Sequence, residues 1–341
     1  MTNATSNPTP HPTATDGSIE IPLVDLDRWF DGDDAERAAL AADVDAHLRR
    51  LGFLVVVNHR IPPEVMAACR RETLAFFHQP DEVKEGVALS GEAYRGWVGP
   101  GLESNAATYG VDTPPDVKET YAFGPVDVPD ETLRERAPRW FEPNLWPPSP
   151  AEFRPAAEAW WRGARGLADE LLQIFALALG LPQHHLVELC SATTSTVSLN
   201  WYWPRTHAEP DPGQFRIGPH TDFGTLTILD REPGSGGLQV LDESGAWIDV
   251  PVVEGGLIVN TGDMFSRWTN DRWQSNEHRV LPPPADDPDE ELVSLIFFHE
   301  PNFDAVVDPF PTCVSDEWPA KYPPITADEY LGAKMDALSV G

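Results

Sequence analysis

Two polar side chains one residue apart, His220 and Asp222, stand at the start of an apolar stretch of the sequence. If that stretch is a strand, its side chains alternate between two faces, so both residues point to the same side. An imidazole and a carboxylate on one face can bind a metal ion together, but a site needs a third ligand. His278, which begins another short apolar stretch 58 residues later, is the candidate.

Two imidazoles and one carboxylate on one side of a metal ion leave adjacent coordination positions open. That arrangement favours Fe(II) that reacts with dioxygen. Hydrolytic zinc sites use a similar ligand set, so zinc is the competing metal. A zinc hydrolase of that kind needs a nearby glutamate as general base, and the sequence contains no HExxH motif. The residues therefore favour iron and leave zinc as the alternative.

The elements that must position these ligands are short strands in the C-terminal half of the chain. From about residue 194, apolar residues recur with a period of two, and Gly, Pro, Asn and Asp separate the stretches. Seven such stretches cover residues 195–203, 225–229, 237–241, 247–250, 256–260, 277–281 and 292–298. Many short strands with turn signals between them predict an antiparallel jelly roll. In such a barrel, strands far apart in sequence become neighbours, so His278 can face the other two ligands.

The N-terminal half predicts helices packed around that barrel, which gives an α+β fold. Helix signals cover residues 33–52, 62–80 and 151–182, a buried strand covers 53–58, and residues 92–150 are rich in Gly, Pro and Trp and predict loops. The last segment, 327–338, predicts a closing helix. We expect a disordered tail (1–18), an N-terminal region (19–150), a supporting helix (151–190), the jelly-roll core (191–310) and a C-terminal helix and tail (311–341).

Composition limits the partners of this 341-residue chain. Its formal net charge of -31 repels phosphate backbones and anionic lipid, so we expect no nucleic acid and no membrane as partner. No stretch of 18 apolar residues is present, and the N-terminus resembles no signal peptide. The three cysteines, Cys69, Cys190 and Cys313, are far apart, which favours reduced thiols and a cytoplasmic location. We expect a monomer or weak homo-oligomer that acts on a small molecule.

Several stretches of the sequence resemble one enzyme family. They are "NWYWP", "RIGPHTDFGTLTIL", "GGLQV", "GDMFSRWTNDRWQSNEHRV" and "SLIFFHEPNFDA", with "IPLVDLDRW" and "GFLVVVNHRIP" in the N-terminal region. The chain resembles the iron(II) and 2-oxoglutarate dependent dioxygenases, in the branch similar to isopenicillin N synthase. The resemblance runs from about residue 19 to 335 and implies a double-stranded β-helix core.

The resemblance also implies the chemistry. His220, Asp222 and His278 would be the iron ligands, with 2-oxoglutarate chelating the iron and one position left for O2. The metal and cosubstrate carry such chemistry, while the protein positions the substrate. Hydroxylation, desaturation or cyclisation of a small organic molecule all fit. Asn200 and Tyr202 match the family's NxY motif, whose tyrosine meets the distal carboxylate of 2-oxoglutarate.

The family's RxS motif is incomplete in this chain. Ser294 matches its serine, but Leu292 stands at the arginine position. A buried carboxylate without a cation is costly, so another arginine must compensate or 2-oxoglutarate is not used. Candidate cations are Arg216, Arg267 and Arg279, with Arg216 and Arg279 assigned to the cosubstrate. Leu292 leaves two alternatives: an iron oxidase of the same fold that does not use 2-oxoglutarate, and an inactive protein that binds only a metal or ligand.

The substrate pocket is expected under two segments of the N-terminal half. Residues 92–104 and 115–125 resemble lid segments that cross the mouth of the barrel. Substrate contacts are assigned to Arg95, Trp97, Tyr121 and Phe123. The alternative for each aromatic residue is packing between the helices and the sheet.

Overall fold

The structure is a computed structural model that describes residues 20–89, 94–104, 114–211, 213–287 and 289–338. The predicted tail, 1–18, and residues 92–93 of the first predicted lid segment lie outside the described residues. No described helix is long and apolar enough to span a lipid bilayer.

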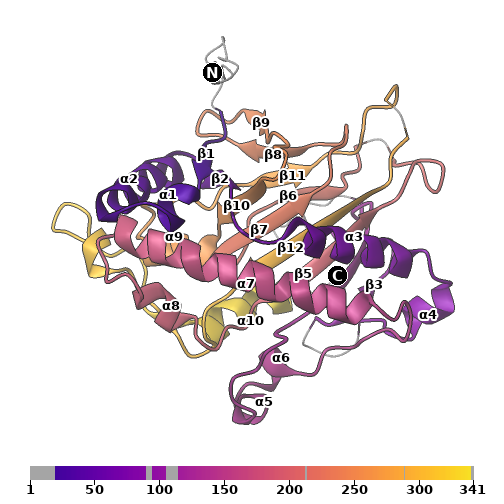
Figure 1. Cartoon of the computed structure of the whole chain (residues 1–341), viewed down its shortest axis with the longest axis horizontal. Coiled ribbons are helices and arrows are strands. Elements are labelled where there is room, and N and C mark those ends of the chain that lie inside the picture. Colours follow the sequence, from indigo (N-terminus) through magenta and orange to yellow (C-terminus); the bar gives the residue numbers. More distant parts are fainter. Residues whose placement is uncertain (1–19, 90–93, 105–113, 212, 288, 339–341) are drawn as a thin grey trace, which may run out of the picture.

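Two sheets that face each other form the centre of the molecule (Figure 1). The large sheet has the order β1 (Leu23–Asp25), β2 (Phe53–Val57), β10 (Leu257–Thr261), β7 (Leu226–Arg231), β12 (Leu292–His299), β5 (Thr196–Tyr202), β4 (Glu119–Phe123) and β3 (Gly96–Val98). The smaller sheet has the order β6 (Ile217–His220), β11 (His278–Val280), β8 (Leu238–Leu241) and β9 (Trp247–Asp249). The predicted α+β fold with a jelly-roll core is confirmed. All seven predicted stretches contain a strand.

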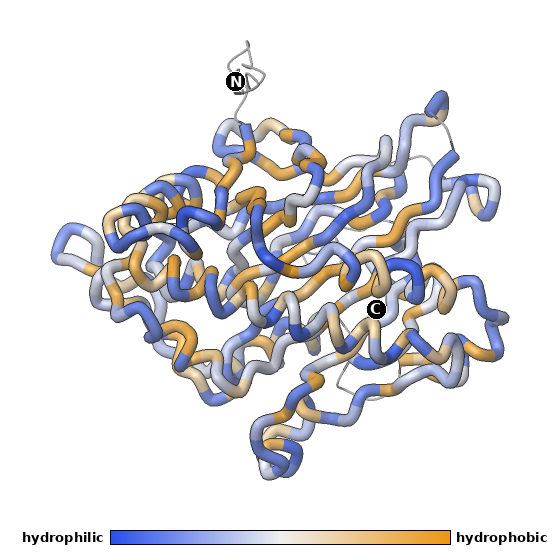
Figure 2. The backbone as a smooth tube through the Cα atoms, in the orientation of Figure 1, coloured by the Kyte–Doolittle hydropathy of each residue, from blue (hydrophilic) through white to orange (hydrophobic). Residues whose placement is uncertain are grey.

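Side chains of the large sheet alternate between an outer face under helices and an inner face toward the small sheet. The outer face is covered by α3 (Pro63–Phe77) and α7 (Phe153–Ala178), and α2 (Asp34–Arg50) packs beside α7 (Figure 1). α7 buries apolar side chains at three- and four-residue spacing along one side. Figure 2 shows apolar residues concentrated in the strands, whereas the outermost loops are mostly hydrophilic.

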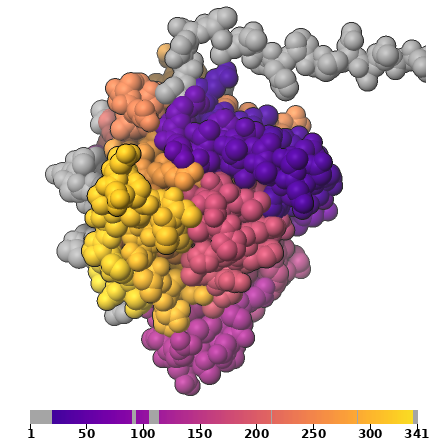
Figure 3. Space-filling model, turned by 90° about the vertical axis from the view of Figure 1, so that its left-hand side faces the viewer, coloured from indigo at the N-terminus to yellow at the C-terminus, as the bar shows by residue number. Residues whose placement is uncertain are grey.

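The remaining helices are short or peripheral. They are α1 (Asp27–Phe30), α4 (Asp81–Glu85), α5 (Thr132–Arg136), α6 (Pro138–Phe141), α8 (His185–Leu189), α9 (Asp263–Trp268) and α10 (Ala327–Leu338). A 3-10 turn (Pro311–Cys313) and a small sheet of β13 (Val306–Val307) and β14 (Ile325–Thr326) precede α10. Figure 3 shows this C-terminal part, in yellow, against α7 and the N-terminal helices.

The prediction of loops for residues 92–150 is wrong in part, because that segment contains β3, β4, α5 and α6. β4 lies between β5 and β3, and its five residues are all buried. A strand covered on both faces does not show the alternation of polar and apolar residues that identifies a half-buried strand in a sequence. The segment therefore adds two strands to the edge of the large sheet.

Candidate metal centre

The three predicted ligands meet at one point between the two sheets. His220 ends β6, His278 begins β11, and the two residues are directly paired across these antiparallel strands. Asp222 Oδ1 lies 3.8 Å from His220 Nε2 and 3.7 Å from His278 Nε2. One donor atom of each residue lies within 4.8 Å of the other two. Strand alternation does not place Asp222, because β6 ends at His220 and the turn after it carries the carboxylate.

Hydrogen bonds fix the direction of each donor atom. His220 Nδ1 lies 2.8 Å from the carbonyl of Gly218, and His278 Nδ1 lies 3.2 Å from the carbonyl of Asn276. A ring nitrogen that donates to a carbonyl leaves Nε2 as the lone-pair donor to a metal. Asp222 Oδ2 accepts hydrogen bonds from Thr227 and Asn260, so its Oδ1 faces the two imidazoles.

The protonation states of His220 and Asp222 suit a metal ion. Burial and the neighbouring His278 lower the pKa of His220 to about 4, so its imidazole is neutral at pH 7. Burial would raise the pKa of Asp222, but the two imidazoles and its hydrogen bonds outweigh that effect and lower it. Two imidazoles and one carboxylate are a donor set that ferrous iron accepts.

The turn that carries Asp222 is held by the start of α9. The backbone N–H of Gly262 donates to the carbonyl of Thr225 at 2.8 Å, and that of Asp263 donates to the carbonyl of Asp222 at 2.8 Å. The first N–H groups of a helix have no partner within the helix, so the turn satisfies them. A β-carbon on Gly262 would lie 2.5 Å from the Gly224 carbonyl oxygen. Gly262 thus permits this close contact of two backbones.

A cavity of about 900 Å³ lies over the three ligands, between the sheets. The inner face of the large sheet lines it in successive rows of directly opposite residues. Asn200, Ser294 and Arg231 form one such row across β5, β12 and β7. Tyr202 and Leu292 form the next row, and the Tyr202 hydroxyl lies 3.2 Å from Ser294 Oγ.

Arg231 is the residue that the sequence analysis missed in this row. Burial lowers the pKa of its guanidinium, and Nη1 reaches the Val250 carbonyl at 3.5 Å. Among the described residues, no carboxylate forms an ion pair with it. Its sequence position gave little signal, because it ends a strand just before the turn "EPG". The pairing of Arg231 with Ser294 depends on the register between β7 and β12, which the sequence alone does not give.

Of the arginines considered in the sequence analysis, Arg216 borders the cosubstrate residues, whereas Arg279 and Arg267 lie elsewhere. Arg216 lines the cavity and stacks on the Tyr202 ring at 5.2 Å, but it forms an ion pair of 2.9 Å with Glu290. Arg279 does not face the cosubstrate residues, because it stacks on Trp247 at 4.0 Å and hydrogen-bonds Gln239. Arg267 donates to the carbonyl of Pro323 and stacks on Tyr322 in the C-terminal part.

The predicted substrate residues divide into two pairs. Arg95 and Trp97 line the cavity. Tyr121 and Phe123 instead pack in the hydrophobic core, where Tyr121 contacts Phe153 with ring centroids 4.8 Å apart. Both belong to β4, whose odd-numbered side chains here point to the helices and not to the barrel interior.

Glu300 is a second cavity residue that the sequence analysis missed. It follows β12 directly, lines the cavity and is only 8% exposed. Its Oε2 has no hydrogen-bond partner among the described residues. Burial, and then the charge of Asp222, raise its pKa well above the usual value. The sequence "FFHEP" gave no indication that this carboxyl lies next to the metal ligands.

Comparison with known families covers most of the chain. Residues 21–149 match the family described as non-haem dioxygenase in morphine synthesis N-terminal. Residues 194–301 match the 2OG-Fe(II) oxygenase superfamily. Validamycin A dioxygenase from Streptomyces hygroscopicus subsp. limoneus is 36% identical over 322 residues, which cover 94% of this chain and 84% of that protein. Jasmonate-induced oxygenase 1 from Arabidopsis thaliana is 31% identical, covering 92% of this chain and 72% of that protein.

Solved structures agree with these relatives. A full-length Neurospora crassa protein, solved in complex with alpha-KG and thymine, superposes with a TM-score of 0.83 at 27% identity, covering 95% of this chain and 98% of that chain. A 2OG-Fe(II) oxygenase family protein from Caulobacter crescentus superposes with a TM-score of 0.80 at 28% identity, covering 93% of this chain and 98% of that chain.

Proposed function

Because the chain belongs to the 2OG-Fe(II) oxygenase superfamily, and is an Fe(II) and 2-oxoglutarate dependent dioxygenase of small molecules, we propose that His220, Asp222 and His278 are its iron ligands. The observation that carries this assignment is the convergence of their donor atoms within 4.8 Å. When bound, ferrous iron and 2-oxoglutarate supply the oxidation, in which O2 converts 2-oxoglutarate to succinate and CO2 while the substrate is oxidised.

The chain's own residues position the reactants and exclude water. Thr227 and Asn260 hold the Asp222 carboxylate, so that its Oδ1 stays directed at the metal position. Phe53 packs edge-on against the His278 ring, with centroids 5.3 Å apart, and covers that side of the site. Leu238, Ile296 and Phe298 add apolar surface to the cavity wall, which lowers the local dielectric constant.

Arg231 takes the role that the resemblance gives to an arginine at position 292. It faces the cavity opposite Ser294, beside the Tyr202 hydroxyl, and has no ion-pair partner among the described residues. A half-buried guanidinium of this kind can bind a carboxylate in bidentate fashion. The distal carboxylate of 2-oxoglutarate would thus contact Arg231, Ser294 and Tyr202. Arg216 supports the site by stacking on Tyr202, while Glu290 neutralises its charge.

Two observations argue against the alternatives raised by Leu292. A cation faces the same cavity from the neighbouring strand, which supports Arg231 as the partner of the distal carboxylate. Relatives named as 2-oxoglutarate-Fe(II) oxidoreductases, such as the one from Emericella nidulans at 31% identity, cover 91% of this chain. We therefore assign 2-oxoglutarate as the cosubstrate.

Validamycin A is the first compound to test as substrate, because a dioxygenase named for it is similar to this chain over 94% of its length. The protein with Fe(II) and 2-oxoglutarate, kept without oxygen, should show the weak visible charge-transfer band of the chelate. Exposure to air with validamycin A should then yield succinate and an oxidised product in equal amounts. Absence of the band at saturating 2-oxoglutarate would contradict the cosubstrate assignment. A band without product would reject only this substrate.

A further inference from the structure

Glu300 presents a carboxyl group to the cavity from a rigid position. Its backbone N–H donates to Ser195 Oγ at 2.9 Å, and its carbonyl accepts a hydrogen bond from Thr193. Its carboxyl packs against Gly224, where an added β-carbon would lie 2.5 Å from both carboxyl oxygens. The side chain is therefore held in place from both sides, next to the turn that carries Asp222.

The carboxyl has no internal partner that would explain its burial. Among the described residues, none forms an ion pair with Glu300, and its Oε2 accepts no hydrogen bond. Other acidic residues of the cavity differ in this respect, since Glu103 pairs with Lys118, and Glu232 accepts from the backbone of Val293 and lies 3.8 Å from Arg70. A buried carboxyl without a partner costs the folded state free energy, which a ligand group can recover on binding.

The negative charge of the whole chain favours a positively charged ligand group at Glu300 over a negatively charged one. A net charge of -31 attracts small cations toward the protein and repels anions. Glutamate also differs from glutamine of nearly the same shape chiefly in its ability to carry charge. A hydroxyl group would be bound as well by an amide, whereas a positively charged nitrogen gains most from a carboxylate in a place of low dielectric constant. Burial and the charge of Asp222 raise the pKa of Glu300 and favour its neutral acid when no ligand is bound, and a bound cation shifts the group to its ionised form.

We propose that Glu300 is a substrate-binding residue whose carboxylate accepts hydrogen bonds from a protonated amine, so that the enzyme oxidises small molecules carrying a basic nitrogen. The inference rests on the proposed function, because Glu300 lines the same cavity as the three proposed iron ligands. The amine binds at the end of the cavity near Gly224 and Thr194, and the rest of the substrate extends over the metal centre.

A set of three probes with one shape and different charge tests the proposal. Cyclohexylamine, cyclohexanol and cyclohexanecarboxylate are titrated into the Fe(II) and 2-oxoglutarate complex, without oxygen at pH 7, and binding is measured by calorimetry. We expect the amine to bind at least about tenfold more tightly than the alcohol, which corresponds to about 1.4 kcal/mol. The carboxylate should bind most weakly. Equal binding of amine and alcohol, including no detectable binding of either, would overturn the proposal.

Two variants locate the effect. Glu300→Gln keeps the shape of the side chain and should abolish the preference for the amine, whereas Glu232→Gln removes one negative charge elsewhere in the cavity and should retain it. Both variants should retain the charge-transfer band with 2-oxoglutarate. A preference that survives in Glu300→Gln would reject the role of Glu300. The titrations are repeated without iron and 2-oxoglutarate. If the native protein shows no charge-transfer band, the proposed function is contradicted. The preference for the amine over the alcohol can still be measured in the metal-free protein, so the two proposals can fail independently.

Discussion

The two oxygens of Asp222 have different partners, and this difference predicts how the metal centre responds to a change in a neighbouring residue. Asn260 donates to Oδ2 at 2.7 Å and is not itself one of the three ligands. Asn260→Ala should therefore lower the affinity for Fe(II) by about 10- to 100-fold, the usual effect of removing a residue that orients a ligand. Gln239→Ala, on a strand of the small sheet outside this network, is the control and should leave iron affinity unchanged. Equilibrium competition with a chelator measures both.

Arg231 and Leu292 offer a direct test of which strand supplies the cation for 2-oxoglutarate. Arg231→Gln should raise the KM for 2-oxoglutarate at least about 30-fold, because loss of a buried charge partner costs about 2 kcal/mol or more. The double variant Arg231→Gln with Leu292→Arg should recover part of that loss, since both positions face the same cavity. Arg279→Gln, whose guanidinium stacks on Trp247, should keep the native KM. A native KM in Arg231→Gln would remove Arg231 from the cosubstrate site.

At the scale of elements, the contact between α9 and the turn after β6 couples the barrel frame to the metal centre. Gly262→Ala would place a β-carbon 2.5 Å from the Gly224 carbonyl oxygen, so one of the two backbones must move. We expect a loss of about 1 to 3 kcal/mol in the free energy of unfolding and weaker Fe(II) binding. Gly166→Ala on α7 is the matched control, because nothing lies within 4 Å of the added carbon. That control should be neutral or stabilising by up to about 1 kcal/mol. Denaturant unfolding measures the stability of both variants, and iron titration measures their affinity for Fe(II). Equal results for the two variants would contradict the prediction.

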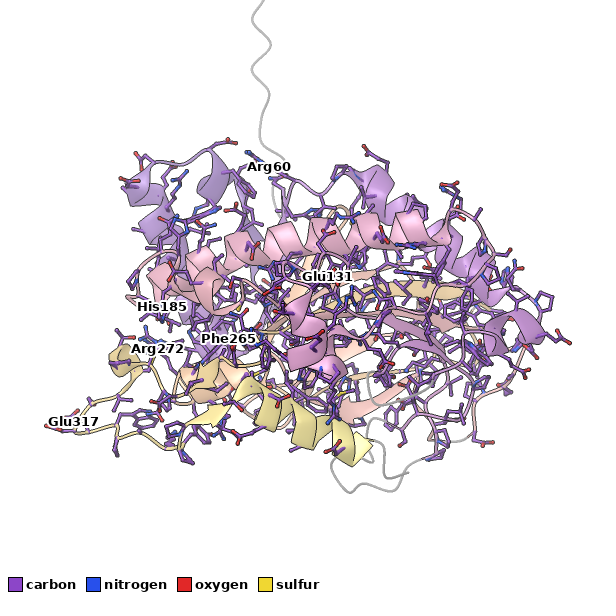
Figure 4. All side chains as sticks on the ribbon, turned by 90° about the horizontal axis from the view of Figure 1, so that it is seen from below. Arg60, Glu131, His185, Phe265, Arg272 and Glu317 are labelled. Carbon is purple, nitrogen blue, oxygen red and sulfur yellow. The ribbon has the colours of Figure 1, made fainter. Side chains whose placement is uncertain are left out.

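A second coupling of elements joins α2 to the loop after α9. Asp45 accepts hydrogen bonds from Arg272 at 2.9 and 3.0 Å and from the Trp273 indole at 2.9 Å. Figure 4 labels Arg272 and Phe265 on the side of the molecule where α7 ends, and Arg272 also reaches the Ala178 carbonyl there at 3.4 Å. Burial would raise the pKa of Asp45, but its hydrogen bonds with Arg272 and Trp273 outweigh this and lower it.

The lowered pKa of Asp45 fixes the pH dependence of this contact. A carboxyl whose pKa is lower in the folded state stabilises the fold above its unfolded pKa, 3.8, and loses that contribution as the pH falls through the folded value. Asp45→Asn should lower the free energy of unfolding by about 2 kcal/mol at pH 7. The difference between native protein and variant should stay constant from pH 7 to about pH 4 and shrink below it. A difference that grows on acidification would contradict this role of Asp45.

The periodicity of apolar residues predicted where strands lie in the sequence better than it predicted which residues of neighbouring strands are paired. Alternation identified the strand that carries His278, but none of the seven predicted stretches covers β6, which ends at His220. Alternation also missed β4, which is covered on both faces. The substrate contact that the resemblance suggested for Tyr121 depends on which face of that strand the ring occupies, and the ring lies in the core. Arg231 could not be assigned either, since a sequence does not state which residue of β7 lies opposite Ser294. Register between strands is fixed by packing of the whole sheet.

At the scale of the whole molecule, the net charge of -31 predicts a response to salt. Like charges spread over one folded chain repel each other, and raising the salt concentration from about 0.01 to about 1 M shortens the screening length from about 30 to about 3 Å. The thermal unfolding midpoint should therefore rise with NaCl and with KCl to the same extent. Calorimetric scans at both concentrations measure it, with an equal osmolarity of sucrose as reference for non-ionic effects. A midpoint that falls with both salts would show that attractive ion pairs dominate.

The face shared by Arg231, Ser294 and Leu292 bears on how relatives of this enzyme are recognised. A pattern search that demands an arginine two positions before the serine would discard this chain, although a guanidinium stands across the neighbouring strand. Classification of such enzymes gains from asking which cation reaches the barrel interior in three dimensions. Chains that were excluded because they lack that arginine should be examined again for a cation that reaches the barrel interior from another strand.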